Sequence, residues 1–593
     1  MAHMTRGESE AEIVRRVAAE RARLEAAAGL DSSTHVHFHR PPERPFTADE
    51  RDRVTILFGG LTWKHEELLR AVFEGRGYRC DVLPAPNLAA YQVGREQGNV
   101  GQCNPTYFTV GALIQYLRRL EADGLSREDI VDRYVFFTAG TCGPCRFGMY
   151  EAEYRFALQN AGFPEFRVLL FQQNDGLKAT SGEPGLKFTV DFGMSALMAF
   201  TLGDVIHQLV YRVRPYEVAA GETDRVMKEV VSRLARLVRD RKLFELSDVP
   251  PRWLAPILPR GGKRYDFFNT LGKIREHLFG EALFDALAEV RELVDAIEVD
   301  RLRVKPIVKT TGEFWAQTTE SAGNFDMFSF LESEGAEVLV DPIGSWVMYL
   351  LFQKQLVADA SRGLDLPEGP RWRHPFLSLA SELRYRGRHL LFTAGERVWA
   401  WQYHRLVDAL GGLLHRLPDQ KELARLAAPF YNPLARGGEG HLEVAKTVYH
   451  TMHHHCHMVL SLKPFGCMPS TQSDGAQSAV VNRFKDIIFL PIETAGDGEV
   501  HARSRVQMTL ADAKAKTRRE FGASLSQTGK RLADIRAYAG EHQELRRALY
   551  VVPSHPGVAG SAANFVLHVS DLMDRHRRSR AAIVGPAPAE QLS

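Results

Sequence analysis

The sequence predicts an α/β fold with two parallel-sheet lobes of the Rossmann or flavodoxin-like kind, and helical domains between and around them. Short apolar runs typical of buried strands alternate with stretches of helical period, first over 53–173 and again over 303–494. With 593 residues, the chain also exceeds the roughly 100–200 residues of one domain. Both observations indicate several domains built from strand–helix units.

Composition and charge exclude some classes of protein. Hydrophobic residues make up 45% of the chain and charged residues 25%, as in ordinary globular proteins. The 75 basic and 73 acidic residues leave a net charge of +2, which gives no reason to expect a nucleic-acid partner. No apolar run reaches the roughly 18 residues of a membrane span, and the N-terminus is charged and helical rather than a signal peptide. We therefore expect a cytoplasmic protein with no membrane partner.

The first half of the chain is expected to hold three segments. Residues 1–50 have the pattern of an amphipathic helix followed by a proline-rich linker. Residues 51–200 are predicted to form the first α/β lobe, and residues 201–300 a helical segment. The strands expected in this lobe lie in "RVTILFGG", "RCDVLPAP", "YVFFTAG" and "FRVLLFQQ".

The second half repeats the strand–helix pattern. Residues 301–344 together with 436–555 are predicted to form the second α/β lobe, and residues 345–435 a helical insertion. Residues 556–593 are expected to be a C-terminal helix and a disordered tail. The strands expected in the second lobe lie in "RVKPIVKTTGEFW", "EGAEVLVDPIG", "HMVLSLKPFG" and "KDIIFLPIET".

Two of the six cysteines, Cys142 and Cys145, stand in "TAGTCGPCRFG", directly after a predicted strand and before a predicted helix. Six cysteines in so long a chain are too few for a disulfide framework, and clustered thiols in the cytosol more often bind metals or catalyse. A single Cys-x-x-Cys pair fits a redox disulfide, half of a zinc site or part of an iron–sulfur site. The positions of the other cysteines are needed to distinguish these three alternatives.

Cys103 and Cys467 repeat this arrangement at two distant places. Cys103 lies in "GNVGQCNPTYF", where Asn104 and Pro105 are typical of a helix start, and Cys467 follows a strand and a tight turn in "SLKPFGCMPS". Helix N-termini stabilise thiolates and anionic clusters. Because strand-end thiols recur on both lobes, and ligands of such sheets bind at the carboxyl ends of strands, we expect one shared site between the lobes.

Cys456 is the fifth candidate, and it is surrounded by histidines. Zinc is the alternative here, because Cys and His at helical spacing can share a face. Structural zinc sites commonly use two Cys-x-x-Cys pairs, whereas this chain has one, so the thiols favour an iron–sulfur cluster. Cys80 is interpreted as a thiol in the core of a strand. The histidines near Cys456 are His450, His453, His454, His455 and His457.

No nucleotide-binding motif is present. The nearest approach to a phosphate-binding loop is "GASLSQTGKR", in which the glycine spacing is wrong and Arg531 replaces the hydroxyl residue. No G-x-G-x-x-G follows a predicted strand. We expect no bound nucleotide, so any ATP used in the reaction would be bound by another polypeptide.

Five stretches carry a resemblance to a known family. They are "TILFGGLTWKHEELL", "GNVGQCNPTYFTVGALIQYL", "FFTAGTCGPCRFGMYEAEYRFALQNAGF", "VKPIVKTTGEFWAQTTESAGNFDMF" and "KPFGCMPSTQSDGAQSAVVNRFKDIIFLPIE". The chain resembles the 2-hydroxyacyl-CoA dehydratase family with its benzoyl-CoA reductase and double-cubane cluster relatives. It is most similar to the dehydratase-like C-terminal part of activase-related fusion proteins.

The resemblance implies an iron–sulfur cofactor, either [4Fe–4S] or a double-cubane [8Fe–9S] cluster, held in a cleft between lobes. Carried over to this chain, the ligand candidates are Cys103, Cys142, Cys145 and Cys467, with Cys456 next. It also implies a separate ATPase activator as electron donor, and it is compatible with a homodimer.

Three functions remain open at this point. The first is an iron–sulfur reductase or electron-transfer component that receives low-potential electrons from the activator. The second is a radical 2-hydroxyacyl-CoA dehydratase or aromatic acyl-CoA reductase, for which "TTGEFW" (310–315) would line the substrate pocket. The third is a zinc-stabilised, non-enzymatic scaffold built on Cys456 and its histidines.

Overall fold

The structure is a computed structural model that describes residues 10–29, 44–140, 145–172, 185–242, 244–246, 262–366, 374–435 and 437–584. The chain divides into two compact units, Met1–Arg44 and Pro45–Ser593. In the first unit lies α1 (Glu10–Ala27), the helix expected near the N-terminus. Most of the linker before residue 44 and the last nine residues, predicted to be disordered, lie outside the described residues.

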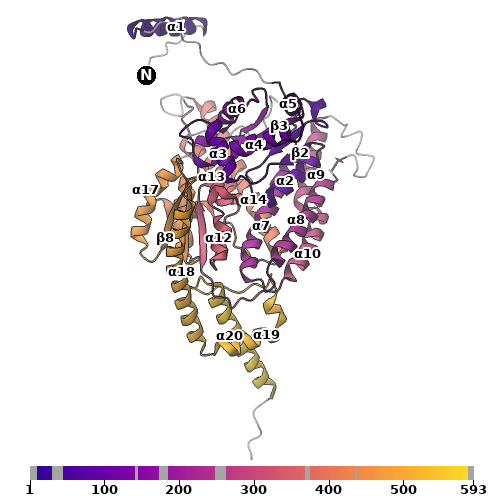
Figure 1. Ribbon diagram of the computed structural model, residues 1–593, viewed down its shortest axis with the longest axis vertical. Coiled ribbons are helices and arrows are strands. Elements are labelled where there is room, and N and C mark those ends of the chain that lie inside the picture. The colour runs from indigo at the N-terminus through magenta and orange to yellow at the C-terminus, as the bar shows by residue number, and fades with distance from the viewer. Residues whose placement is uncertain are drawn as a thin grey trace, which may run out of the picture. The chain divides into compact units, whose positions relative to one another are not determined.

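Two four-stranded sheets, all parallel, form the two lobes of the second unit (Figure 1). Their strand orders are β2-β1-β3-β4 and β6-β5-β7-β8, so both follow the 2-1-3-4 order of flavodoxin-like folds. The predicted two-lobe α/β fold is confirmed, and each strand lies in a stretch where one was expected. The strands are β1 (Thr55–Phe58), β2 (Arg79–Val82), β3 (Tyr134–Gly140), β4 (Val168–Gln172), β5 (Ile307–Gly312), β6 (Glu337–Leu339), β7 (Met458–Pro464) and β8 (Ile488–Thr494).

Helices cover both faces of the first sheet. Successive residues of a strand point to opposite sides, so apolar side chains on each face are buried under helices. Ile56 and Phe58 of β1 face one core, whereas Leu57 between them faces the other. The first core is shared with α2 (Trp63–Glu74), α7 (Val190–Val213), α8 (Glu222–Asp240), α10 (Glu281–Asp295) and α14 (Pro375–Ala409). The second core is shared with α4 (Asn104–Ala122), α5 (Arg127–Arg133) and α6 (Tyr150–Asn160). Further helices near this lobe are α3 (Leu88–Gln97) and α9 (Lys263–Phe279).

Helix α7 is a core helix of the first lobe. With the short 3-10 turn that follows it, the segment Val190–Tyr216 is long and apolar enough to cross a membrane, but 72% of its apolar 18-residue window is buried inside the protein. It packs against α2 and α8, and the three helices lie side by side in Figure 1. The boundary predicted at residue 200 therefore falls inside a helix that belongs to the first lobe.

The second sheet is also covered on both faces. One core holds β5, β7 and β8 together with α12 (Met327–Ser333) and α18 (Glu499–Thr528). The other holds residues of α13 (Ile343–Ala360), α15 (Gln420–Ala427), α16 (Gly440–Met452) and α17 (Met468–Arg483). Beyond the sheet, α19 (Leu532–Glu541) and α20 (Ser561–Val584) share a smaller core with α18. Residues 345–435, expected to be a helical insertion, contain most of α13 together with α14 and α15.

Candidate functional site

The carboxyl ends of the central strands carry the candidate residues in both lobes. A doubly wound sheet binds ligands where its strand order reverses, which is between β1 and β3 in the first lobe and between β5 and β7 in the second. Cys145 lies in the connection after β3, Cys467 in the connection after β7, and Glu313 directly follows β5. The two lobes thus present chemically active side chains at equivalent topological positions.

Each of the three described candidate thiols in these loops sits at the N-cap of a helix. Cys103 precedes α4, Cys145 precedes the short 3-10 helix η2 (Arg146–Met149) that leads into α6, and Cys467 precedes α17. Both α4 and α17 have a proline in the first turn, where no amide hydrogen is needed. At these positions the partial positive charge of a helix end favours a thiolate or an anionic cluster.

Direct contacts join the three loops across the two lobes. The backbone N–H of Asn104 donates to the carbonyl of Phe465 at 3.1 Å. Gly466 has a φ of +77°, and a Cβ added to it would lie 3.3 Å from the carbonyl oxygen of Gln102, 3.5 Å from Cys103 Cα and 3.6 Å from Arg146 Nη1. Because Arg146 directly follows the second thiol, the segments that carry all three thiols meet at this glycine.

The structure does not place the other two candidate ligands, Cys142 and Cys456, beside these three thiols. Cys142 lies outside the described residues, so its placement beside Cys145 stays a prediction. Cys456 precedes β7 and Cys467 follows it. A seven-residue strand spans about 23 Å, so the structure does not bring Cys456 to the other thiols. It lies instead at the amino end of the second sheet, where burial raises its pKa to about 12 against the opposing effect of the nearby Lys309.

Cys80, which the sequence assigned to a strand core, lies in β2. Its thiol is 3.5 Å from the carbonyl oxygen of Arg70, and burial raises its pKa to about 12. Cys80 therefore has the surroundings of a structural thiol rather than a ligand.

Two hydroxyl groups surround the thiol of Cys103. Its Sγ lies 3.0 Å from Tyr150 Oη and 3.2 Å from Thr106 Oγ1. Burial raises the pKa of Cys103, and these two hydroxyls act against that shift. Hydroxyl groups that donate to a ligand sulfur adjust the electronic properties of a bound metal group, so Tyr150 and Thr106 are placed to do this if Cys103 is a ligand.

Burial governs the protonation of the other two thiols as well. It raises the pKa of Cys145 to about 12, and it raises the pKa of Cys467 too. The carboxylate of Glu313 adds to both shifts and to that of Cys103. Without a bound group these thiols are protonated at neutral pH, and a soft metal has to displace the protons to bind.

Three buried carboxyl groups lie beside the thiols. Burial raises the pKa of Glu313 and Glu439, and each lies close enough to add to the pKa of Cys145. Glu443, which acts on Cys467 in the same way, accepts hydrogen bonds from Ser470 Oγ at 2.8 Å and from Ser473 Oγ. Sequence reasoning found only the stretch that contains Glu313. The other two glutamates belong to no recognisable motif and reach the site through the N-terminal end of α16.

The donors at this site are three thiols that come from different loops. Within the described ranges, no three His, Cys, Asp or Glu side chains lie close enough together to hold one ion. Thiolates that hold a cubane bind different iron atoms and are therefore spread more widely than the ligands of one zinc ion. Cys103, Cys145 and Cys467 are soft donors of the kind that zinc and iron–sulfur clusters both take.

Comparison with known proteins adds nothing to this site: no family model, no curated protein and no solved structure matches the chain.

Proposed function

We propose that this protein is an iron–sulfur oxidoreductase or electron-transfer component of the cytoplasm. In this proposal a [4Fe–4S] or double-cubane cluster is held by Cys103, Cys145 and Cys467, together with Cys142. Its electrons come from a separate ATPase activator. The observation that carries the proposal is the meeting of three thiol-bearing loops, from both lobes, at Gly466.

The chain's own residues would perform three tasks at this site. The thiols bind the cluster, which when bound supplies one-electron transfer at low potential. The helix ends behind Cys103, Cys145 and Cys467 offset the negative charge of the cluster. Tyr150 and Thr106 stand beside one ligand sulfur, and Glu313 can hold a proton next to all three.

In this proposal the electron donor would dock on the thiol-bearing loops. Four apolar side chains on the three thiol-bearing segments are exposed, and exposed apolar groups that gather in one place mark contact surfaces. Their exposed fractions are 99% for Val100, 61% for Met149, 58% for Phe465 and 42% for Met468. An ATPase activator that docks here would deliver its electron over a short path.

Anaerobic reconstitution with iron and sulfide tests the proposal. We expect the reconstituted protein to bind stoichiometric iron and sulfide, and to give an electron paramagnetic resonance signal after reduction with dithionite. Cys103→Ser and Cys467→Ser should each lose most of the iron, whereas Cys80→Ser, the matched control, should keep it. Iron-free protein after reconstitution, or equal iron in all three variants, would refute the proposal.

A radical acyl-CoA dehydratase or reductase is the second candidate. The observation that favours it is the pair of buried carboxyl groups, Glu313 and Glu439, beside the thiols, because such groups can serve as general acid or base for a substrate that reacts there. Titration of the cluster-loaded protein with acyl-CoA thioesters distinguishes the two functions. A substrate-dependent change in the resonance signal supports the second, and its absence supports pure electron transfer.

A further inference from the structure

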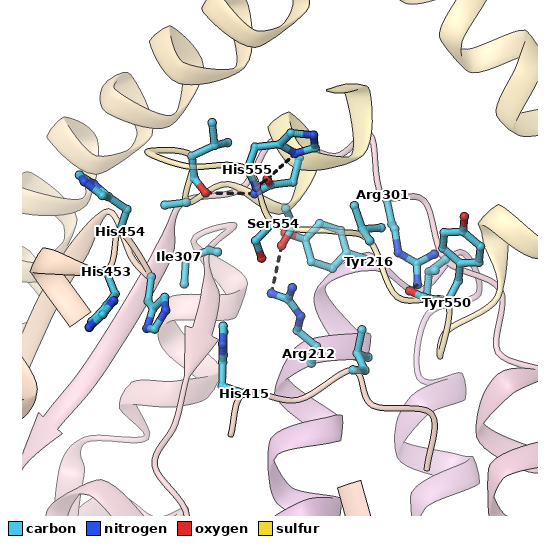
Figure 2. A pocket seen from close by; sticks show the side chains of 18 of the residues that line it. Arg212, Tyr216, Arg301, Ile307, His415, His453, His454, Tyr550, Ser554 and His555 are labelled. Carbon is cyan, nitrogen blue, oxygen red and sulfur yellow. Dashed lines mark hydrogen bonds between the residues drawn. The ribbon is translucent and has the colours of Figure 1, made fainter. Parts of the chain in front are cut away.

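A second site lies at the opposite end of the second sheet. A cavity of about 300 Å³ is lined by Ile307 at the start of β5, the turn 453–455 after α16, and the segment 548–564 (Figure 2). Its volume is at the lower end of the range for small-molecule sites. Since β5 and β7 run from this cavity towards the thiols, the two sites are separated by the length of the sheet.

The lining of the cavity is rich in cationic and imidazole groups. No Asp or Glu belongs to it among the described residues. Arg301 donates to the backbone carbonyls of Leu545, Arg547, Ala548 and Tyr550. These acceptors are neutral, so they do not cancel the positive charge of the Arg301 guanidinium. The lining residues of this kind are Arg212, Arg301, His415, His453, His454, His455 and His555.

Arg212 keeps part of its guanidinium group available. Its Nη1 pairs with Glu337 and lies 3.1 Å from Ser561 Oγ. For Nε and Nη2, no hydrogen-bond partner is found in the part of the chain that the structure describes, and the side chain is 30% exposed. Figure 2 shows Arg212 extending into the centre of the cavity, below Ser554. Two N–H groups in this fork match the two oxygens of a carboxylate.

The histidines stand beside Arg212 as neutral hydrogen-bonding groups. Burial lowers the pKa of His415 to about 3 and of His455 to about 4, so each ring carries a single N–H at neutral pH. Their ring centroids are 4.8 Å apart, and that of His453 is 5.5 Å from His455. His415 has no hydrogen bond to other described residues, so its N–H can serve a ligand.

Part of the remaining wall is apolar, next to the polar side chains of Tyr216, Tyr550, Ser554, Ser561 and Asn564. It is formed by side chains of the end of α7, the segment before β5, the loop after α14 and the segment 548–564. These residues are Val213, Val299, Leu413, Ala548, Val552 and Val558. A ligand that fills the cavity therefore needs a compact apolar body as well as a polar end.

We propose that this cavity binds a small organic acid, with its carboxylate on Arg212 and His415 and its apolar body against the valine-rich wall. Three features around one cavity support this ligand class: the available guanidinium fork of Arg212, the imidazole of His415, which has no hydrogen-bond partner among the described residues, and the apolar part of the wall. The site is independent of the thiol site and of the function proposed for it.

Calorimetric titration of the full chain tests the ligand class. Benzoate and hexanoate are the probes, because each joins one carboxylate to a compact apolar body. Benzamide is the neutral isostere of benzoate, and inorganic phosphate is an anion without the apolar part. We expect saturable binding of one of the two acids and at least about 10-fold weaker binding of benzamide and phosphate. If neither acid binds saturably up to roughly 10 mM, or benzamide binds equally well, the proposal is overturned.

Variants locate the binding site. Arg212→Lys keeps the charge beside Glu337 but removes the fork, and His415→Phe removes the N–H at nearly constant shape; each should weaken binding about 10-fold. Arg214→Lys is the matched control, since Arg214 pairs with Asp224 and Glu332 and does not line the cavity. Cys467→Ser should also bind normally. Unchanged affinity in the first two variants, with circular dichroism showing that both fold, would place the acid elsewhere and refute the assignment.

Discussion

At the scale of single residues, Gly466 decides whether the three thiols can share a site. Its φ of +77° lies in the left-handed region, and an added Cβ would stand 3.3 Å from Gln102 O and 3.5 Å from Cys103 Cα. We therefore expect Gly466→Ala to cost about 1–2 kcal/mol and to lower iron content after reconstitution, because the strain moves the loop before Cys467. Urea denaturation and iron analysis on the same preparation measure both effects.

Gly475 provides the matched control for that experiment. It lies within α17, a few residues after Cys467, and an added Cβ would meet no atom within 4 Å. Gly475→Ala should therefore leave iron content unchanged and raise the stability by roughly 0.5–1 kcal/mol. If Gly466→Ala behaved in the same way as Gly475→Ala, the three loops would not depend on the contact at Gly466.

At the scale of elements, the close crossing of α3 and α4 positions the first thiol. An added Cβ on Gly111 of α4 would lie 1.7 Å from the carbonyl oxygen of Ala90, and one on Gly94 of α3 would lie 1.9 Å from that of Tyr107. The two backbones are therefore in contact, and only glycine fits. Because backbone atoms cannot yield, Gly111→Ala should push α4 away, destabilise the protein by about 1–3 kcal/mol and reduce iron binding at Cys103.

Gly522 of α18 controls for the effect of alanine on a helix. It is exposed, and an added Cβ there would meet nothing within 4 Å. Gly522→Ala is expected to stabilise the protein by roughly 0.5–1 kcal/mol, as seen by thermal unfolding. Equal stability of the Gly111 and Gly522 variants would contradict the proposed crossing.

The elements also show what the sequence could predict. All eight strands lie in the expected stretches because their apolar runs are short and end in turns. The association of Cys103, Cys145 and Cys467 followed from their shared position before helices. Cys456 was added to them through the family resemblance and its histidine neighbours, but β7 separates it from Cys467 and places it at the other end of the sheet.

The carboxyl groups of the site could be predicted less well. Glu439 and Glu443 come from the start of α16, whose sequence contains no feature of a ligand or an acid–base group. Their importance arises from burial beside Cys145 and Cys467, which depends on how α16 and α17 pack on the second sheet. Such tertiary neighbours leave no periodic pattern in one sequence.

At the scale of the whole molecule, a largely buried ion pair joins the two lobes. Lys64 of α2 in the first lobe donates to Glu320 of the second at 2.7 Å, and Tyr211 of α7 donates to the same carboxylate at 2.8 Å. The side chain of Lys64 is only 2% exposed and that of Glu320 21%. If one of the two charged side chains were removed, the other would stay buried without a compensating charge. Substitution of either partner therefore destabilises the contact between the lobes.

This pair leads to a prediction for the stability of the lobe interface. Burial opposes ionisation of Glu320, but the ammonium of Lys64 lowers its pKa from 4.5 to about 2. The stabilisation is therefore complete above about pH 4.5 and is lost as the pH falls towards 2. At pH 7, Glu320→Gln should cost about 3 kcal/mol in urea denaturation, whereas the double variant Lys64→Met/Glu320→Leu should stay within about 1 kcal/mol of the parent. A single variant as stable as the parent, or a double variant as weak as the single one, would show that this pair does not couple the lobes.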